Sequence, residues 1–178
     1  MSDWDTLFDD LYLRTYASLQ KPEDAEAQAE AVARLAGLEP GANVLDCPCG
    51  YGRHTIPLAR AGYHVVGADR SEVLLEEARR RAGEAEWPKW VRADYRELPF
   101  EDASFDCCLN LFSSLGYWGE EGDRQARGEF RRVLRPGGSL VVGCTAIGSC
   151  PSSAPTAGRS CPTGRCVSND AASTRSRG

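Results

Sequence analysis

The chain has 178 residues, of which 42% are hydrophobic, so it is long enough to bury the core of one domain. Its formal net charge of −5 argues against a broad nucleic-acid-binding surface. No apolar stretch is long enough to span a bilayer, and the acidic residues 1–5 lack the pattern of a signal peptide. We therefore expect a soluble cytoplasmic protein without a nucleic-acid or membrane partner.

The eight cysteines form neither a disulfide framework nor a zinc site. The two histidines, His54 and His64, do not stand in metal-ligand spacing with them. Cys107 and Cys108 are adjacent in an apolar run, so one of the two is expected to face the core. The prediction is reduced thiols and no bound metal.

Helical and strand patterns alternate along the chain. Helices are predicted at 3–19, 23–38, 52–61, 72–82 and 123–134, and strands at 43–46, 64–69, 89–93, 105–111 and 139–143. This alternation predicts an α/β fold, a Rossmann-like, doubly wound and mostly parallel sheet in a three-layer αβα arrangement. Right-handed crossovers would place the ends of the first, second and fourth strands along one edge, where ligands bind in such sheets.

The segment VLDCPCGYGRHT, residues 44–55, joins the first strand to the next helix through a glycine-rich turn. Gly50 and Gly52 would let the backbone approach a ligand closely, although a plain tight turn would have the same composition. Asp69 ends the second strand, where a carboxylate can accept both hydroxyls of an adenosine ribose. Together these features favour a cofactor with an adenosine portion.

Two further residues distinguish between cofactors. A dinucleotide fingerprint needs a third glycine or alanine, but the matching position is Thr55. Asp46 stands just before the loop, where its charge would repel a pyrophosphate and attract an amine and a sulfonium. S-adenosylmethionine is therefore favoured over NAD(P), and an oxidoreductase is the less favoured alternative.

On these motifs the chain resembles a class I S-adenosylmethionine-dependent methyltransferase. VLDCPCGYGRHT resembles motif I, GADRS the acidic second motif, RADYRELPFEDASFDCCLNLFSSLGYW the adenine and fourth-strand region, and EFRRVLRPGGSLVV the segment into strand five. The Pro-Cys-Gly-Tyr-Gly-Arg-His form resembles a bacterial small-molecule subgroup, although Pro48 replaces the commoner glycine. The resemblance covers most of residues 40–143.

The resemblance implies a set of cofactor-binding residues. Asp46 and the loop backbone would surround the methionine portion, Asp69 would bind the ribose, and Asp94 would accept from the adenine amino group unless it is only a turn acid. The full set is Asp46, Cys49, Gly50, Gly52, Asp69, Arg70, Ala93, Asp94, Tyr95, Asn110 and Leu111. It also implies three segments: a helical cap or lid at 1–38, the S-adenosylmethionine-binding core at 39–144, and a tail at 145–178.

The catalytic residues cannot be assigned from the sequence. Methyl transfer from a sulfonium needs alignment of acceptor, methyl and sulfur more than a fixed triad. His54 follows the loop, and a structural role is favoured for it over a general base. Other aromatic and hydroxyl side chains are candidates either for contact with the cofactor or substrate or for packing: Tyr12, Tyr16, Ser113, Ser114, Tyr117 and Trp118.

The tail does not resemble a protein core. Residues 145–178 contain no Leu, Phe, Tyr, Trp or Met, and their composition predicts disorder. We interpret it as the product of truncation or of a reading-frame change near Cys144. The sheet would then lack its last two strands, and strand five would have an unpaired edge.

The sequence thus predicts an enzyme that transfers a methyl group from S-adenosylmethionine to a small-molecule acceptor by in-line displacement. The alternative is an impaired, cofactor-binding remnant without its full substrate wall. The identity of the acceptor and the oligomeric state are left open.

Overall fold

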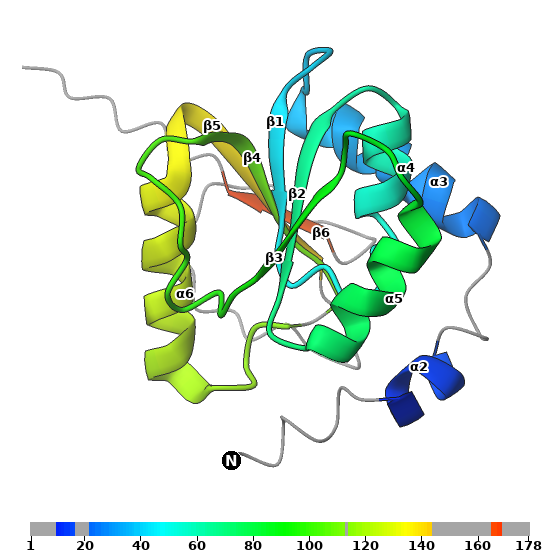
Figure 1. The fold of residues 1–178 in the computed structure, drawn as a ribbon. Coiled ribbons are helices and arrows are strands. Elements are labelled where there is room, and N and C mark those ends of the chain that lie inside the picture. Colours follow the sequence, from blue (N-terminus) through cyan, green and yellow to red (C-terminus); the bar gives the residue numbers. More distant parts are fainter. Residues whose placement is uncertain (1–9, 17–21, 113, 144–164, 169–178) are drawn as a thin grey trace, which may run out of the picture.

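The computed structural model describes residues 10–16, 22–112, 114–143 and 165–168, which form a sheet flanked by helices (Figure 1). The helices are α2 (Asp10–Tyr16), α3 (Pro22–Ala36), α4 (Thr55–Arg60), α5 (Glu72–Ala82) and α6 (Gly119–Val133). The strands are β1 (Asn43–Asp46), β2 (His64–Asp69), β3 (Lys89–Arg92), β4 (Phe105–Asn110), β5 (Leu134–Gly143) and β6 (Arg165–Ser168). None of the described helices has the length and apolar character needed to cross a membrane.

The strand order of the sheet is β3-β2-β1-β4-β5-β6, and β1 to β5 are all parallel. The chain moves outward from β1 to β3, then returns to the other side of β1 with β4. The carboxyl ends of β1 and β4 therefore flank a topological switch point, where sheets of this kind bind ligands. The predicted α/β, Rossmann-like arrangement is confirmed.

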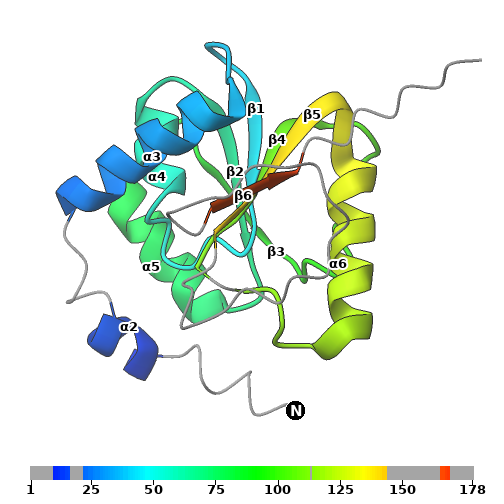
Figure 2. The same ribbon diagram turned by 180° about the vertical axis from the view of Figure 1, so that it is seen from behind.

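Helices cover both faces of the sheet, with α3, α4 and α5 on one side and α6 on the other (Figures 1 and 2). Side chains of a strand alternate between the faces, so Val44 packs towards α3 and α4 whereas Leu45 packs towards α6. Cys107 and Cys108 divide in the same way, and both are fully buried. One of these cysteines was expected to face the core, and both do, because the sheet has a core on each face.

Two helices begin several residues away from the predicted position, whereas α3 begins at Pro22, one residue before the predicted start. The helix expected from Gly52 begins at Thr55, because Gly52 has a φ of 80°, which no α-helical residue adopts. The helix expected from Asp123 already begins at Gly119, with Glu120 and Glu121 in its first turn, where acids interact favourably with the helix dipole.

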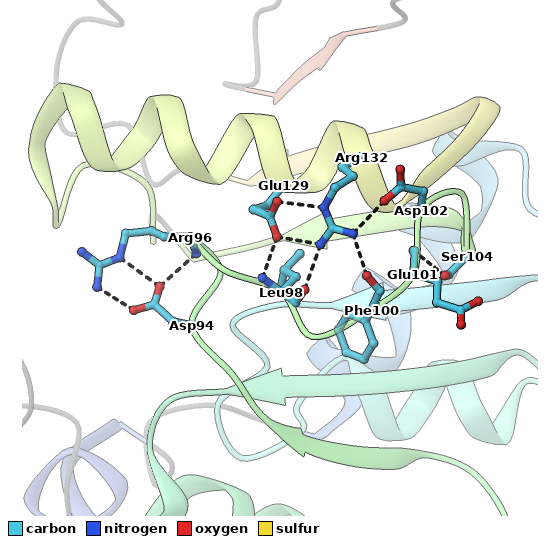
Figure 3. Close-up of polar contacts among 9 residues, drawn as sticks. All are labelled: Asp94, Arg96, Leu98, Phe100, Glu101, Asp102, Ser104, Glu129 and Arg132. Atoms are coloured by element: carbon cyan, nitrogen blue, oxygen red, sulfur yellow. Dashed lines mark hydrogen bonds and ion pairs between the residues drawn. The ribbon is translucent and has the colours of Figure 1, made fainter.

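Arg132 of α6 fixes the irregular connection between β3 and β4 (Figure 3). Its guanidinium donates to the carbonyls of Phe100 (2.6 Å) and Leu98 (2.8 Å) and to Asp102 Oδ1 (2.9 Å). Glu129 pairs with Arg132 and also accepts from the Leu98 N–H at 2.7 Å. These bonds satisfy backbone groups that no helix or sheet pairs, and so attach the connection to α6.

The short strand β6 differs from the prediction that no strand follows β5. Residues Arg165–Ser168 pair antiparallel with β5, from Leu140 opposite Ser168 to Gly143 opposite Arg165. Backbone groups at an open sheet edge can pair with a segment that has few large apolar residues. The rest of the tail, residues 145–164 and 169–178, lies outside the described residues, so its predicted disorder stays a prediction.

Candidate functional site

The loop after β1 extends the hydrogen bonding of the sheet beyond the strand ends. The Cys47 N–H donates to the Leu109 carbonyl of β4, and the Cys49 N–H donates to the Ala68 carbonyl of β2, both at 2.9 Å. The loop is therefore anchored to the strands on both sides of β1. This places residues 47–52 across the switch point of the sheet.

The two loop glycines are required for different reasons. Both have positive φ, 55° at Gly50 and 80° at Gly52. A Cβ on Gly50 would meet nothing within 4 Å, whereas a Cβ on Gly52 would lie 2.6 Å from the Trp90 ring and 3.1 Å from Ile56. Gly50 thus leaves open space that a ligand can enter, and Gly52 makes room for a tryptophan of β3.

We expect Gly52→Ala to lower the free energy of unfolding by about 2–4 kcal/mol, because it combines a left-handed backbone with an overpacked core. Gly50→Ala is the matched control: it has the backbone penalty alone, about 1 kcal/mol. Urea unfolding of both variants measures the difference. Equal losses of stability would contradict the packing role of Gly52.

Asp69, at the end of β2, organises the loop that faces it. Its carboxylate is buried and accepts from the N–H groups of Gly50 (2.8 Å) and Ser71 (2.9 Å). Burial raises the pKa of Asp69, while the bonds from Ser71 and Gly50 act in the opposite direction. Each carboxylate oxygen has a second lone pair, so both can also accept from a ligand hydroxyl.

Asp46, at the end of β1, is a buried acid with one unused oxygen. Its Oδ2 accepts from the Thr55 hydroxyl at 2.5 Å, and its Oδ1 has no hydrogen-bond partner among the described residues. Burial, with a contribution from the charge of Asp69, raises the pKa of Asp46 to about 7. A cation bound beside Oδ1 would stabilise the charged form.

Asp94 follows β3 and is already ion-paired. Arg96 donates to it from its backbone and side chain, with the shortest bond, to Oδ2, at 2.6 Å (Figure 3). Arg70 approaches the same carboxylate at 3.6 Å. Burial alone would raise the pKa of Asp94, but the Arg96 bonds and both positive charges lower it overall. Trp118 stacks with Arg96 and Arg70, at 3.8 and 4.9 Å from ring centroid to guanidinium carbon.

The remaining predicted residues lie beside these carboxylates. The Ala93 N–H donates to the Asp69 carbonyl at 2.9 Å, and the buried Tyr95 hydroxyl donates to the Ser114 carbonyl at 2.9 Å. Asn110 is buried at the end of β4, where its Nδ2 donates to the Cys47 carbonyl at 3.0 Å and its Oδ1 has no partner among the described residues. Leu111 is half-buried and packs against the core below α3 and α4.

The three carboxylates lie at one edge of the sheet. Asp46 ends β1, Asp69 ends β2 and Asp94 follows β3, and these neighbouring strands run parallel. The buried Cys47 thiol lies near all three: burial and then the negative charges of Asp69, Asp46 and Asp94 raise its pKa. The predicted convergence of these acids is therefore present, although their ligand roles remain proposals.

His54 connects this edge to α3. The imidazole is buried, and its Nε2 lies 3.0 Å from Gln28 Oε1, an oxygen that can only accept. Burial, followed by the charge of Arg53, lowers the pKa of His54 to about 4, so the ring is neutral at neutral pH. This geometry favours the predicted structural role.

Tyr12 lies on α2, next to α5, while the side chain of Tyr16 and all of Ser113 lie outside the described residues.

Several features of the site were not predicted from the sequence. One is the Thr55 bond to Asp46, because the sequence indicates only that Thr55 stands where a dinucleotide fingerprint has glycine or alanine. The stack of Arg70, Trp118 and Arg96 joins segments far apart in the sequence, and no local pattern indicates it.

Two surface hollows of about 630 and 500 Å³ border α3, α4 and the amino ends of β1 and β4, and the three carboxylates do not line them.

Comparison with known proteins agrees with this geometry. The profile of a family described as a methyltransferase domain matches residues 44–138. The chain belongs to this methyltransferase family. Demethylmenaquinone methyltransferase of Clavibacter sepedonicus is 40% identical over 65% of the chain and 44% of that protein. The enzyme of the same name from Tropheryma whipplei is 36% identical over 74% of the chain and 53% of that protein. The matched part thus spans about half of these two methyltransferases.

Solved structures share the fold. A protein from Pyrococcus horikoshii OT3 superposes with a TM-score of 0.66 at 27% identity, covering 76% of this chain and 66% of that one. A structure described as the [4+2]-cyclase SpnF gives a TM-score of 0.58 at 30% identity, over 66% of this chain and 43% of that one. The methyltransferase fold thus also occurs in a protein described by a different reaction.

S-adenosylmethionine is the cofactor that this methyltransferase family implies, and the described residues fit it. Two buried acceptor oxygens, Asp46 Oδ1 and Asn110 Oδ1, have no donor among the described residues. A buried acceptor without a donor is costly. An ammonium group would supply the donor, and a sulfonium would stabilise the ionised acid through its positive charge. The open space beside Gly50 and the free lone pairs of Asp69 suit close approach of a ribose.

Proposed function

We propose that this methyltransferase transfers a methyl group from S-adenosylmethionine to a small organic acceptor. The observation that carries the proposal is the pair of unpartnered oxygens, Asp46 Oδ1 and Asn110 Oδ1, at the edge where Asp69 faces the loop. Such a set suits a cationic cofactor better than a pyrophosphate, which two nearby carboxylates would repel. The names of the curated relatives support a small organic acceptor.

Each part of the cofactor would have its own group of residues. Asp46, Asn110 and the loop backbone at 49–52 would hold the amino-acid and sulfonium portions, with Leu111 beside them. Asp69 would accept from the ribose hydroxyls. Arg70, Ala93, Asp94 and Tyr95 would surround the adenine. Because Arg96 now occupies both oxygens of Asp94, an adenine amino group would have to share that carboxylate with Arg96.

When bound, the cofactor supplies an activated methyl group, which an acceptor takes by in-line displacement. The protein's part is to hold the reacting groups in line and to keep water away from them. His54 is neutral and already bonded to Gln28, so we assign it to support of the loop rather than to proton transfer.

The test is calorimetric titration of the chain with S-adenosylhomocysteine, followed by incubation with methyl-labelled S-adenosylmethionine and a panel of phenol, hydroquinone, amine and carboxylic-acid acceptors. We expect binding of S-adenosylhomocysteine and label transfer to at least one acceptor class. Binding without transfer would support a cofactor-binding remnant. Binding of NADH with no binding of S-adenosylhomocysteine would reject the proposal.

A further inference from the structure

Arg53, directly after the loop, is an arginine without an acidic partner in the described part of the chain. Its side chain is half-buried, and its Nε is buried without a hydrogen-bond acceptor. Eight described arginines pair with acids: Arg70, Arg79, Arg80, Arg81, Arg96, Arg124, Arg132 and Arg135. A buried donor without an acceptor is costly unless a ligand supplies one.

The guanidinium of Arg53 rests on an exposed aromatic ring. Its central carbon lies 4.8 Å from the ring centroid of Phe112, two residues beyond the end of β4. Phe112 is 46% exposed and has a φ of 66°, in the left-handed region. A bulky residue in this region is uncommon, and such strained positions cluster at active sites and ligand-binding segments.

The surroundings leave the positive charge of Arg53 available. The His54 ring lies 5.8 Å from that of Phe112 and is neutral at neutral pH, so it does not compete for an anion. Arg53 and Phe112 come from the loop after β1 and the segment after β4, on the two sides of the switch point. An acceptor must reach the methyl group at this crevice.

We propose that Arg53, stacked on Phe112, receives an acidic group of the methyl acceptor, so that the acceptor is a small organic acid with an apolar or aromatic body. This inference rests on the proposed methyltransferase function and specifies its substrate class. Arginine matches a carboxylate with parallel N–H donors, and the exposed Phe112 ring offers apolar surface beside it. The carboxylate in the methionine portion of the cofactor is the rival source of an anion, but it offers no apolar body to cover Phe112.

The experiment compares benzoate with benzamide, which have the same shape but differ in charge. Each is titrated by ligand-observed NMR into the full chain, with and without saturating S-adenosylhomocysteine. We expect the wild type to bind benzoate at least about tenfold more tightly than benzamide, and Arg53→Gln to abolish that preference. Arg53→Lys keeps the charge without the planar fork and should retain part of the preference.

Arg80→Gln is the matched control, because Arg80 is an exposed arginine paired with Glu77 on α5. It should change neither ligand's affinity. If Arg53→Gln does not fold, as checked by thermal melting, Phe112→Leu is used instead and should weaken benzoate binding by about threefold through loss of the stacked ring.

Three results would overturn this assignment: no preference for benzoate in the wild type, a preference that survives in Arg53→Gln, or a tenfold loss of S-adenosylhomocysteine affinity in Arg53→Gln with unchanged affinity for 5′-methylthioadenosine. The last result would mean that Arg53 binds the cofactor's own carboxylate, since 5′-methylthioadenosine lacks the amino-acid portion. Failure of the wild type to bind S-adenosylhomocysteine would instead reject the proposed function, while the benzoate titration without cofactor still tests Arg53.

Discussion

Asp69→Ala is expected to weaken binding of S-adenosylhomocysteine at least about 100-fold, because two charge-assisted hydrogen bonds to the ribose hydroxyls would be lost. The variant also removes the acceptor that holds the N–H groups of Gly50 and Ser71, so the loop loses its attachment to β2. Isothermal titration calorimetry at pH 8 measures the loss directly.

Asp106→Ala is a suitable control for this experiment. Asp106 lies at the opposite end of β4, where its carboxylate accepts from the Asn43 N–H at 2.8 Å and pairs with Arg135. Like Asp69, Asp106 accepts a hydrogen bond from a backbone N–H, but it lies away from the candidate site. It should lower stability by about 1 kcal/mol and leave the affinity for S-adenosylhomocysteine unchanged. Equal loss of affinity in both variants would mean that Asp69 acts only through the fold.

The parts of the fold that could be predicted depend on local patterns. Strands 43–46 and 64–69 were predicted with the observed bounds, because each is a short apolar run between turn residues and ends in an acid. The right-handed crossover rule predicts that the ends of the first and second strands meet, and with them Asp46 and Asp69. The position of these two acids at one edge thus follows from chain order alone, whereas Asp94 is predicted by the family resemblance.

The parts that were missed depend on contacts between distant segments. Arg132 attaches the connection after β3 to α6, and nothing around residue 132 indicates which carbonyls it would meet. In the same way, Gly52 looks like a ligand-facing glycine in the sequence, yet its missing side chain accommodates Trp90. The sequence shows Arg53 only as part of a motif, because whether it has an acidic partner among the described residues depends on the placement of neighbouring strands.

Asp46 is expected to make the free energy of unfolding and the affinity for the cofactor change with pH in opposite directions. Burial raises its folded pKa from 3.8 to about 7, so between these values the folded protein binds more protons than the unfolded chain. The contribution of Asp46 to the free energy of unfolding therefore falls as pH rises from about 4 to 7, by about 4 kcal/mol in total for the unliganded protein. The ammonium group of S-adenosylhomocysteine prefers the ionised acid, so affinity should rise about tenfold per pH unit up to pH 7 and then level off.

Asp46→Asn separates this effect from the titration of other groups, because the amide oxygen can still accept from the Thr55 hydroxyl without carrying a charge. Urea unfolding should find the variant more stable than the wild type at both pH 8 and pH 5, by about 4 kcal/mol at pH 8 and by less than half of that at pH 5. Calorimetry should find its affinity for S-adenosylhomocysteine weak and independent of pH between 5 and 8. A wild-type affinity that does not change across this range would show that Asp46 does not face the ammonium group of the ligand. If the free energy of unfolding falls while the affinity rises over this pH range, then the ionised Asp46 destabilises the free protein, and binding of the cofactor offsets that loss of stability.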